Sequence, residues 1–411
     1  MSDKKIKVLV VPSDKWGCGL YRSVSPHRML LEMYPEEFDV EIEYNADWSH
    51  PEKYKDYDIV HFHKGLYNDM GPLWGAIKYF KENNIVTIMD IDDNWELTQF
   101  HPLYVSNKMM KAPEKITTTL GMVDYGTTTT EIFAEKMRKY CKNVVVFPNA
   151  IDPNEEQYKP IKNPSNRIRF GFVMGSSHER DMEQFFGVVN CLGQDILNKI
   201  QIVLCGYDLR GNVQIIGKDG KYQGSRPIKP TESVWFTYER NVTDNFKIVS
   251  KEYRDFLLKF LPGAQWPNVD NEPYRREWTK DLNEFAKHYR NVDVLLAPLD
   301  TNSFNEVKSE LKFVEAGFTN TALICSDFGP YHMVGNSLFK KGGVIDETGN
   351  CILVDPSKKH KEWAKYIKKL VENPEYIYLL QNNLHEFVKD RYDIRNVTKN
   401  RADWYRQISK K

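Results

Sequence analysis

The 411-residue sequence has no net charge, because 57 lysine and arginine residues balance 57 aspartate and glutamate residues. We therefore do not expect a protein that binds nucleic acid through its overall field, or a membrane through a polybasic anchor. The sequence also lacks any run that approaches about eighteen apolar residues, the length typical of a transmembrane helix. Its short apolar run near the start predicts neither a membrane span nor a secretory signal peptide.

Cysteine is scarce and scattered, and no CxxC motif occurs. The six cysteines are Cys18, Cys141, Cys191, Cys205, Cys325 and Cys351. This spacing argues against a zinc framework or a set of disulfides, and it is typical of reduced thiols that pack as small hydrophobic groups. We expect a cytoplasmic protein with no structural metal.

Hydrophobic residues make up 41% of the sequence and charged residues 28%, which is the composition of a folded globular protein. Short, β-branched apolar runs alternate with helical patterns, and this alternation predicts parallel α/β layers. The expected strands cover 6–11, 40–44, 59–62, 85–89, 125–128 and 144–147, and then 168–173, 200–204, 292–296, 321–325 and 351–354.

Four prolines between positions 148 and 164 mark a hinge. We predict an N-terminal domain over 1–150, a linker over 151–166, and a C-terminal domain over 167–392 with an insertion at about 206–287. The last helix, at about 393–411, can pack back on the first domain. The fold class is α/β, with two doubly wound Rossmann-like domains facing each other across a cleft, where ligands bind at the carboxyl ends of the strands.

The most informative stretch runs from Leu299 to Asp327. Its apolar residues recur at helical spacing, at Val307, Leu311, Val314 and Phe318, while Lys308, Lys312 and Glu315 share another face. We predict a helix that begins near Asn305, whose free backbone N–H groups and first-turn lysine would bind phosphate. A carboxylate two turns along could accept the hydroxyls of a ribose. The alternative is a solvated face with ion pairs between successive turns.

Four segments give the sequence a recognisable character: FNEVKSELKFVEAG at 304–317, VVVFPNAID at 144–152, FGFVMGSSHERD at 170–181 and VDVLLAPL at 292–299. With them, the sequence resembles the retaining GT-B glycosyltransferases of glycosyltransferase family 4, also called glycosyl transferases group 1. It is similar to a Bacteroidetes-like branch of that family, in which EPYRREWT (272–279) and GPYH (329–332) flank the helix.

The resemblance implies roles for several residues of the helix. Glu315 matches the second glutamate of the E-x7-E pair of the family, which binds the donor ribose, whereas Val307 stands where the first glutamate is expected. Lys308 and Ser309 then become the candidates for the donor diphosphate, with Lys308 in a catalytic role. We add Lys312 to the donor-binding set.

The turn at 175–181 follows a predicted strand, and the backbone of its glycine could approach a phosphate. Gly175 and Ser176 are therefore predicted to bind the donor. Ser176 and Asp181 stand where many family members have arginine and lysine, so Arg180 is proposed as a substitute cation with a catalytic role. An ordinary strand-to-helix turn is the alternative.

A second glycine-rich segment, at 16–22, follows the first predicted strand. In GT-B enzymes such a loop lies beside the donor phosphates and the acceptor, so Gly17 and Gly19 join the predicted donor site. Arg22 stands where the third glycine of GxGxxG would be, which disfavours a dinucleotide site. A plain tight turn remains an alternative.

The acidic run Asp90, Asp92 and Asp93 ends a predicted strand and could hold Mg²⁺ or cap a helix. Because the resembled family is metal-independent, we place these carboxylates on the acceptor side and give Asp92 a catalytic role. His63, at the end of the strand before, is a further acceptor-side candidate.

Arg275 and Arg276, beside Tyr274, form a basic and aromatic cluster in the insertion. Arginine can clamp a phosphate with two hydrogen bonds or stack on a base, so Arg275 is included in the predicted donor site. Packing at the surface is the alternative.

Together the resemblance implies transfer of a sugar from a nucleotide-diphosphate sugar to a hydroxyl acceptor, with retention at the anomeric carbon and no cofactor besides the donor. The acceptor would be a glycan, or lipid-linked or protein-linked, in surface polysaccharide assembly in the cytoplasm or at the inner face of the membrane. No nucleic-acid partner is expected. The rival interpretations are an inactive sugar-nucleotide-binding module, a nucleotide-sugar epimerase and an NAD(P) dehydrogenase, the last disfavoured by the missing GxGxxG.

Overall fold

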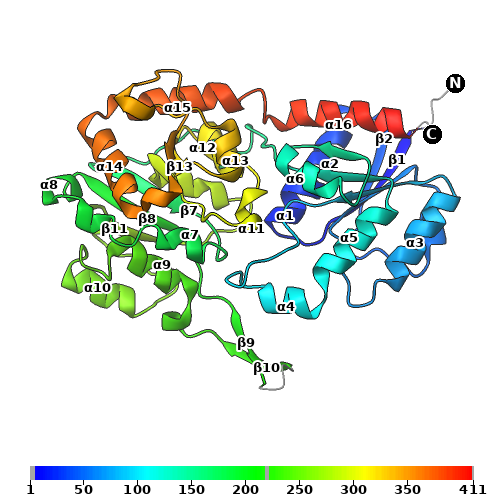
Figure 1. Ribbon diagram of the computed structural model, residues 1–411, viewed down its shortest axis with the longest axis horizontal. Helices are drawn as coiled ribbons and strands as arrows, with labels where there is room; N and C mark the ends of the chain where they lie inside the picture. Colours follow the sequence, from blue (N-terminus) through cyan, green and yellow to red (C-terminus); the bar gives the residue numbers. More distant parts are fainter. Residues whose placement is uncertain (1–4, 218–221, 410–411) are drawn as a thin grey trace. The chain divides into compact units, whose positions relative to one another are not determined.

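The computed structural model describes residues 5–217 and 222–409 (Figure 1). Contacts divide the chain into two compact units. Unit 1 comprises Met1–Glu156, Thr301–Glu315 and Glu386–Lys411, and unit 2 comprises Gln157–Asp300 and Ala316–His385. The chain therefore passes more than once between the two units.

Unit 1 is built on a six-stranded sheet in the order β2-β1-β3-β4-β5-β6, and every neighbouring pair of strands is parallel. The strands are β1 (Ile6–Val11), β2 (Phe38–Ile42), β3 (Ile59–His63), β4 (Val86–Asp90), β5 (Tyr125–Thr128) and β6 (Val144–Val146). Apolar side chains cover both faces of this sheet, as expected for parallel strands that are buried between helices.

Helices of unit 1 cover both faces of its sheet. The helical elements before β6 are α1 (Gly17–Gly19), the π-helix η1 (Leu20–Val24), α2 (Ser25–Met33), the 3-10 helix η2 (Pro51–Tyr54), α3 (Gly71–Glu82), α4 (Tyr104–Met109), α5 (Ala112–Met122) and α6 (Glu131–Met137). The last helix of the chain is α16 (Ile394–Ile408). Leu30 of α2 and Tyr405 of α16 share one apolar cluster with Val8 and Ile88. Leu73 and Ile77 of α3 belong to the cluster that contains Leu9 and Val60. Successive residues of β1 therefore point to opposite faces of the sheet: Val8 packs against α2 and α16 on one face, and Leu9 packs in the cluster of α3 on the other.

Unit 2 contains a second parallel six-stranded sheet, in the order β11-β8-β7-β12-β13-β14. Its strands are β7 (Ile168–Val173), β8 (Ile200–Tyr207), β11 (Tyr274–Trp278), β12 (Val294–Ala297), β13 (Ala322–Ser326) and β14 (Ile352–Val354). The helices that cover it include α7 (Glu179–Glu183), α9 (Val234–Thr243), α10 (Lys251–Leu258), α14 (Lys359–Glu372) and α15 (Glu375–Val388). An antiparallel hairpin, β9 (Asn212–Ile216) and β10 (Tyr222–Pro227), forms a separate two-stranded sheet.

The predicted fold class, two doubly wound Rossmann-like α/β domains, is confirmed by these two sheets. All eleven strands expected from the sequence exist, with boundaries shifted by a few residues at most ends. Two features of the insertion at 206–287 were missed: the hairpin β9–β10 and the edge strand β11. The sequence of β11, YRREW, carries three charged residues, and its pattern therefore lacks the apolar run by which buried parallel strands are recognised.

The prediction of a single helix that begins near Asn305 is wrong. Two short helices, α11 (Ser303–Glu306) and α12 (Leu311–Phe318), are separated by a non-helical link over 307–310. Val307 is buried in the apolar cluster of unit 1, and the buried Glu310 carboxylate accepts a hydrogen bond of 2.8 Å from the Tyr392 hydroxyl. Val307 and Glu310 would share one face of a continuous helix, because they are three residues apart. In the structure, Val307 packs among apolar side chains and Glu310 meets a tyrosine hydroxyl.

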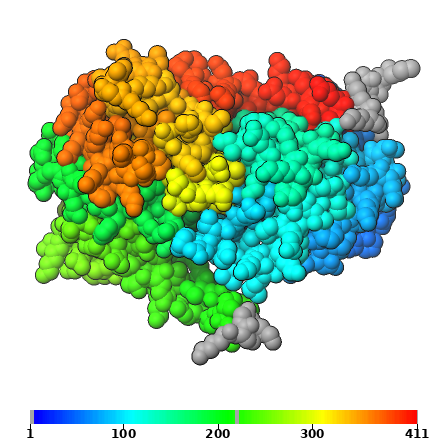
Figure 2. Space-filling view, in the orientation of Figure 1, coloured from blue at the N-terminus to red at the C-terminus, as the bar shows by residue number. Residues whose placement is uncertain are grey.

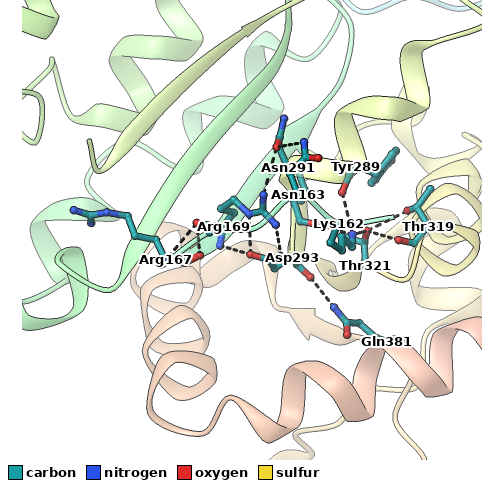
Figure 3. Close-up of polar contacts among 12 residues, drawn as sticks. Lys162, Asn163, Arg167, Arg169, Tyr289, Asn291, Asp293, Thr319, Thr321 and Gln381 are labelled. Atoms are coloured by element: carbon teal, nitrogen blue, oxygen red, sulfur yellow. Dashed lines mark hydrogen bonds and ion pairs between the residues drawn. The ribbon is translucent and has the colours of Figure 1, made fainter. Parts of the chain in front are cut away.

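Both ends of the predicted hinge are hydrogen-bonded within the unit they adjoin. In unit 1, Ile151 forms backbone hydrogen bonds with Tyr392 and Ile394. In unit 2, the Lys162 ammonium donates to the backbone oxygens of Tyr289 (3.0 Å) and Val292 (2.7 Å) and to the Thr321 hydroxyl (2.6 Å; Figure 3). The proline-rich segment 151–166 is therefore hydrogen-bonded to the folded units at Ile151 and at Lys162.

Lys162 gives the first test, because burial lowers its pKa from the ordinary value of 10.5 to about 7. Between these two pH values the unfolded chain binds a proton that the folded chain has released, so stability rises with pH. We expect the free energy of unfolding of the wild type, relative to Lys162→Met, to increase by about 1.4 kcal/mol per pH unit across this window. Urea unfolding at several pH values measures the difference, and a difference that does not change with pH would contradict the assignment.

Candidate functional site

Polar side chains gather where the parallel strands of unit 1 end. The segment after β1 carries Ser13 and Asp14, β3 ends with His63 and is followed by Lys64, and β4 ends with Asp90 and is followed by Asp92 and Asp93. Carboxyl ends of parallel strands meet at one edge of a sheet, which is the usual place for a ligand in this class of fold. The following contacts all lie within unit 1.

The centre of this edge is a buried ion pair between Arg22 and Asp90. The guanidinium Nε and Nη2 atoms lie 2.9 and 2.8 Å from the two carboxylate oxygens, and both side chains are at most 1% exposed. The Thr127 hydroxyl donates a further hydrogen bond of 2.6 Å to Asp90. Burial is the largest single effect and opposes ionisation of Asp90, but the charge and hydrogen bonds of Arg22, together with His63 and Thr127, hold the pKa of Asp90 below its ordinary value. Asp90 therefore has an electrostatic and structural partner inside the protein.

The same arginine extends the network to a third element. Its Nη1 donates to the backbone oxygen of Phe147 (2.6 Å) and to the side-chain oxygen of Asn149 (3.1 Å), just after β6. The Asn149 amide nitrogen in turn donates to the Ser309 hydroxyl at 3.1 Å. Arg22 thus connects the carboxylate at the end of β4 with the link that follows α11.

Asp92 lies in a second, more accessible cluster. One of its oxygens is 3.1 Å from His63 Nε2 and 2.7 Å from Lys64 Nζ, while His63 Nδ1 is 2.8 Å from the Ser13 hydroxyl. Lys64 has a φ of 60°, a left-handed conformation that costs a non-glycine residue on the order of 1 kcal/mol. Lys64 was missed by the sequence reasoning, although a lysine directly after a strand-end histidine was a signal that could have found it.

Asp93 and Cys18 complete this cluster. Potential ligand atoms of Cys18, Asp92 and Asp93 lie within 4.8 Å of one another, so these groups could approach a cation, and the Lys64 ammonium already supplies one positive charge there. Burial raises the pKa of Asp93, the neighbouring charge of Asp92 raises it further, and Lys64 and Lys308 oppose both effects. Burial also raises the pKa of the Cys18 thiol, so we expect this cysteine to be a thiol and not a thiolate nucleophile.

The predicted donor-binding residues Lys308, Ser309, Lys312 and Glu315 also belong to unit 1. Lys308 Nζ lies 5.1 Å from the centre of the Phe304 ring. Glu315 is buried, and its oxygens already have partners: Lys312 Nζ at 2.7 Å and the Tyr21 hydroxyl at 3.2 Å. An ion pair of this kind was the alternative to a ligand site in the sequence analysis. A ribose bound at Glu315 would have to replace one of these existing hydrogen bonds.

Gly17 and Gly19 do not form the loop that was predicted, because they begin the helical segment α1. The Asp14 carboxylate accepts hydrogen bonds from the backbone nitrogens of Trp16 (2.8 Å) and Gly19 (3.1 Å). A Cβ atom at Gly19 would lie 2.1 Å from the Asp14 backbone oxygen, whereas a Cβ at Gly17 would meet open space. Gly19 is thus required by the close approach of Asp14, and only Gly17 leaves room for a ligand.

Unit 2 holds the remaining predicted residues. Gly175 and Ser176 are exposed after β7, and a Cβ at Gly175 would meet nothing within 4 Å. Arg180 pairs with Glu183 on the surface of α7 at 2.7 Å. In the same turn, Asp181 accepts a hydrogen bond of 2.6 Å from the backbone nitrogen of Asp300. The turn after β7 is therefore tied to the end of β12 through Asp181, which was not among the predicted site residues.

Arg275 and Arg276 have carboxylate partners within unit 2. Arg275 pairs with Glu277 (2.9 Å) and Asp270 (3.2 Å), and the nearly buried Arg276 pairs with Glu239 at 2.6 Å. Arg275 lies abreast of Val203 in the middle of the sheet edge, upstream of the carboxyl ends. The structure therefore does not bring Arg275 together with Gly175, and its role in donor binding stays a prediction. A buried group of Cys205, Glu277 and His288, with potential ligand atoms within 4.8 Å, adjoins this edge strand.

Comparison with solved structures shows a shared fold along nearly the whole chain. HepE from Anabaena, solved with UDP and glucose, aligns over 97% of this chain and 99% of its own, with a TM-score of 0.60 and 11% sequence identity. Sucrose-phosphate synthase from Thermosynechococcus elongatus aligns over 98% and 99%, with a TM-score of 0.59 and 12% identity. The UDP-forming α,α-trehalose-phosphate synthase from Burkholderia vietnamiensis aligns over 100% and 98%, with a TM-score of 0.57 and 10% identity.

At these identities the likeness shows the fold alone. No protein-family model matches the sequence, and no curated protein is significantly similar to it. The resemblance to glycosyltransferase family 4, its retaining mechanism and the Bacteroidetes-like branch therefore stay predictions. The GT-B fold class, which those predictions implied, agrees with the solved structures.

The Arg22–Asp90 pair generates a prediction about stability. Arg22→Met leaves a buried carboxylate without its cation, and breaking a buried pair in this way costs about 3–5 kcal/mol. We expect chemical unfolding of the variant to show a loss of that size. Arg22→Met combined with Asp90→Leu removes both charges and should be more stable than Arg22→Met alone. Equal stability of wild type and Arg22→Met would show that the pair has no such role.

Proposed function

We propose that the protein is a glycosyltransferase that moves a sugar from a nucleotide-diphosphate sugar to a hydroxyl acceptor with retention of the anomeric configuration. The observation that carries this proposal is the likeness over 97% of the chain to HepE, a protein solved with UDP and glucose and also with UDP-glucose. It is supported by the cluster of Lys308, Ser309 and Glu315 in the segment that resembles the donor-binding motif.

The proposed chemistry needs positive charge where the bond to the leaving group breaks. Negative charge builds up on the nucleoside diphosphate as the glycosidic bond lengthens, and fixed cations stabilise that charge most in the transition state. We assign this role to Lys308, which lies close enough to Asp93 to influence its ionisation. No metal ion is invoked, because lysine side chains supply the positive charge in this proposal. Glu315 is assigned to the donor ribose, in exchange for its hydrogen bond from Tyr21.

The acceptor is assigned to the cluster around Asp92. His63 and Lys64 fix one oxygen of this carboxylate, so its other oxygen can accept a hydrogen bond from an incoming hydroxyl group. Ser13 holds the far nitrogen of His63 and thereby orients the imidazole. The proposed setting is glycan or surface polysaccharide assembly in the cytoplasm.

One observation favours a second candidate function, a sugar-nucleotide-binding module without turnover. Val307, at the position where the resembled family has its first glutamate, is buried in the apolar cluster of unit 1. The side chain at that position is therefore apolar and directed into the protein, and it supplies no carboxylate near the sugar. A module of this kind would bind the nucleotide sugar but release no product with any acceptor.

Ligand binding to the folded state raises thermal stability, so a thermal-shift screen with UDP-, GDP-, ADP- and CMP-sugars tests the donor assignment. We expect at least one of these nucleotide sugars to raise the Tm. Glu315→Ala should weaken binding of that nucleotide by about 1.5–3 kcal/mol, the range for a hydrogen bond to a charged group. Calorimetry on both proteins gives the affinities. The ribose assignment is wrong if Glu315→Ala binds the nucleotide as tightly as the wild type.

Lys308→Ala tests the catalytic assignment. Loss of about 3 kcal/mol of transition-state stabilisation should lower kcat roughly 10²-fold with the donor found by the screen. The matched control is Lys139→Ala, which removes an exposed lysine of the same unit. If kcat of Lys308→Ala stays near that of the control, Lys308 has no part in the reaction. A wild type that binds donor but never turns over would favour the binding module.

A further inference from the structure

We infer that the segment Phe100–Lys111 of unit 1 is a membrane-binding surface for bilayers that contain anionic lipids. Four large apolar side chains in this short segment are exposed: Phe100 by 43%, Leu103 by 60%, Val105 by 49% and Met109 by 56%. No residue of α4 is buried. The helix lies at the surface of the molecule, in cyan, in Figures 1 and 2.

The exposed residues form an organised face. Val105, Lys108 and Met109 are spaced at i, i+3 and i+4, so they share one side of α4. The Asn107 amide ties the helix to another part of unit 1 by donating to the backbone oxygen of Trp95 at 3.3 Å, and within the segment the Ser106 hydroxyl donates to the backbone oxygen of Leu103. The apolar face is therefore presented to solvent by an anchored element.

The charges of the segment select the kind of partner. Lys108 and Lys111 are exposed beside the apolar side chains, and the sequence from Leu97 to Pro113 contains no aspartate or glutamate. This basic stretch contrasts with the neutral balance of the whole chain. Apolar side chains flanked by lysines bind the interface of an anionic bilayer, where the apolar groups enter the acyl boundary and the ammonium groups meet lipid phosphates.

The surface is compatible with a protein that lies on a bilayer and does not span it. Among residues 5–217 and 222–409, no helix combines the length and apolar character of a membrane span. The segment is also connected to the proposed catalytic region of unit 1, because the His101 ring lies 4.9 Å from the Phe304 ring, over which Lys308 is placed.

Vesicle flotation tests the inference with the full-length protein. We expect the wild type to bind vesicles of phosphatidylcholine with about 30 mol% phosphatidylglycerol, and to bind vesicles of phosphatidylcholine alone much less. Leu103→Ser combined with Met109→Ser should lower the bound fraction at least about tenfold, because the apolar insertion is lost. Lys108→Glu combined with Lys111→Glu should remove the preference for anionic vesicles.

The matched control is Met333→Ser combined with Tyr378→Ser, which removes two side chains of similar exposure, 63% and 68%, from unit 2. This control should bind vesicles like the wild type, and circular dichroism should show that all variants are folded. The inference is overturned if the wild type binds no anionic vesicles, or if the Leu103→Ser, Met109→Ser variant binds them equally well. It is also overturned if the segment instead joins two copies of the chain, seen as a dimer in gel filtration that these two substitutions dissociate without any vesicle binding.

The inference does not depend on the proposed reaction. Vesicle binding is measured without donor or acceptor, and donor binding by the same variants is measured without vesicles. A protein that binds anionic vesicles but no nucleotide sugar would disprove only the proposed function, and the reverse result would disprove only the membrane surface.

Discussion

The carboxyl edge of unit 1 depends on one buried interaction, the ion pair between Arg22 and Asp90. A charge without a partner is very unfavourable at a position with almost no solvent exposure, so each of these two groups requires the other to be in place. Arg22 reaches Asp90 from a π-helix, a wide and rarely used turn that is often found at functional sites. Because the same guanidinium also binds the chain after β6, it fixes the ends of two strands together with the start of the chain.

Groups with a proposed chemical role are joined to this pair or lie near it in unit 1. Asn149 carries the network from Arg22 to Ser309, and His63 lies between Ser13 and Asp92. Residues in such a network lose little freedom when a ligand binds, because their side chains are already oriented by hydrogen bonds. The left-handed backbone of Lys64 is consistent with this view, since its conformational cost is balanced by the ion pair with Asp92.

The sequence was sufficient to predict the parallel strands, because buried parallel strands appear in a sequence as short apolar runs. The polar residues directly after these runs then indicated the carboxyl edge of the sheet. The motifs assigned Lys308, Ser309 and Glu315 to a donor site in the predicted C-terminal domain and Asp92 to the acceptor side in the N-terminal domain, whereas the structure has all four in unit 1. The contacts that define their states could not be predicted, because they join residues far apart in the chain. Tyr21 reaches Glu315 across 294 positions, and Tyr392 holds Glu310 and contributes to the break between α11 and α12. Hydrophobic periodicity predicts which residues are buried, but it does not predict that a helix ends at Glu306 and a new one begins at Leu311.

The zero net charge of the chain is reflected in ion pairs at the carboxyl edge of unit 1. Three cations of unit 1 are each matched to one carboxylate: Arg22 to Asp90, Lys64 to Asp92 and Lys312 to Glu315. Such pairing leaves little long-range field, so a large polyanion would not be attracted to this edge. A small anion is a different case, because it can approach within a few ångströms and interact with one cation directly. Lys308 differs from the paired cations in lying over an aromatic ring, where its charge is felt by Asp93. Our assignment of a diphosphate to this edge therefore depends on the placement of Lys308, and not on the total charge of the chain.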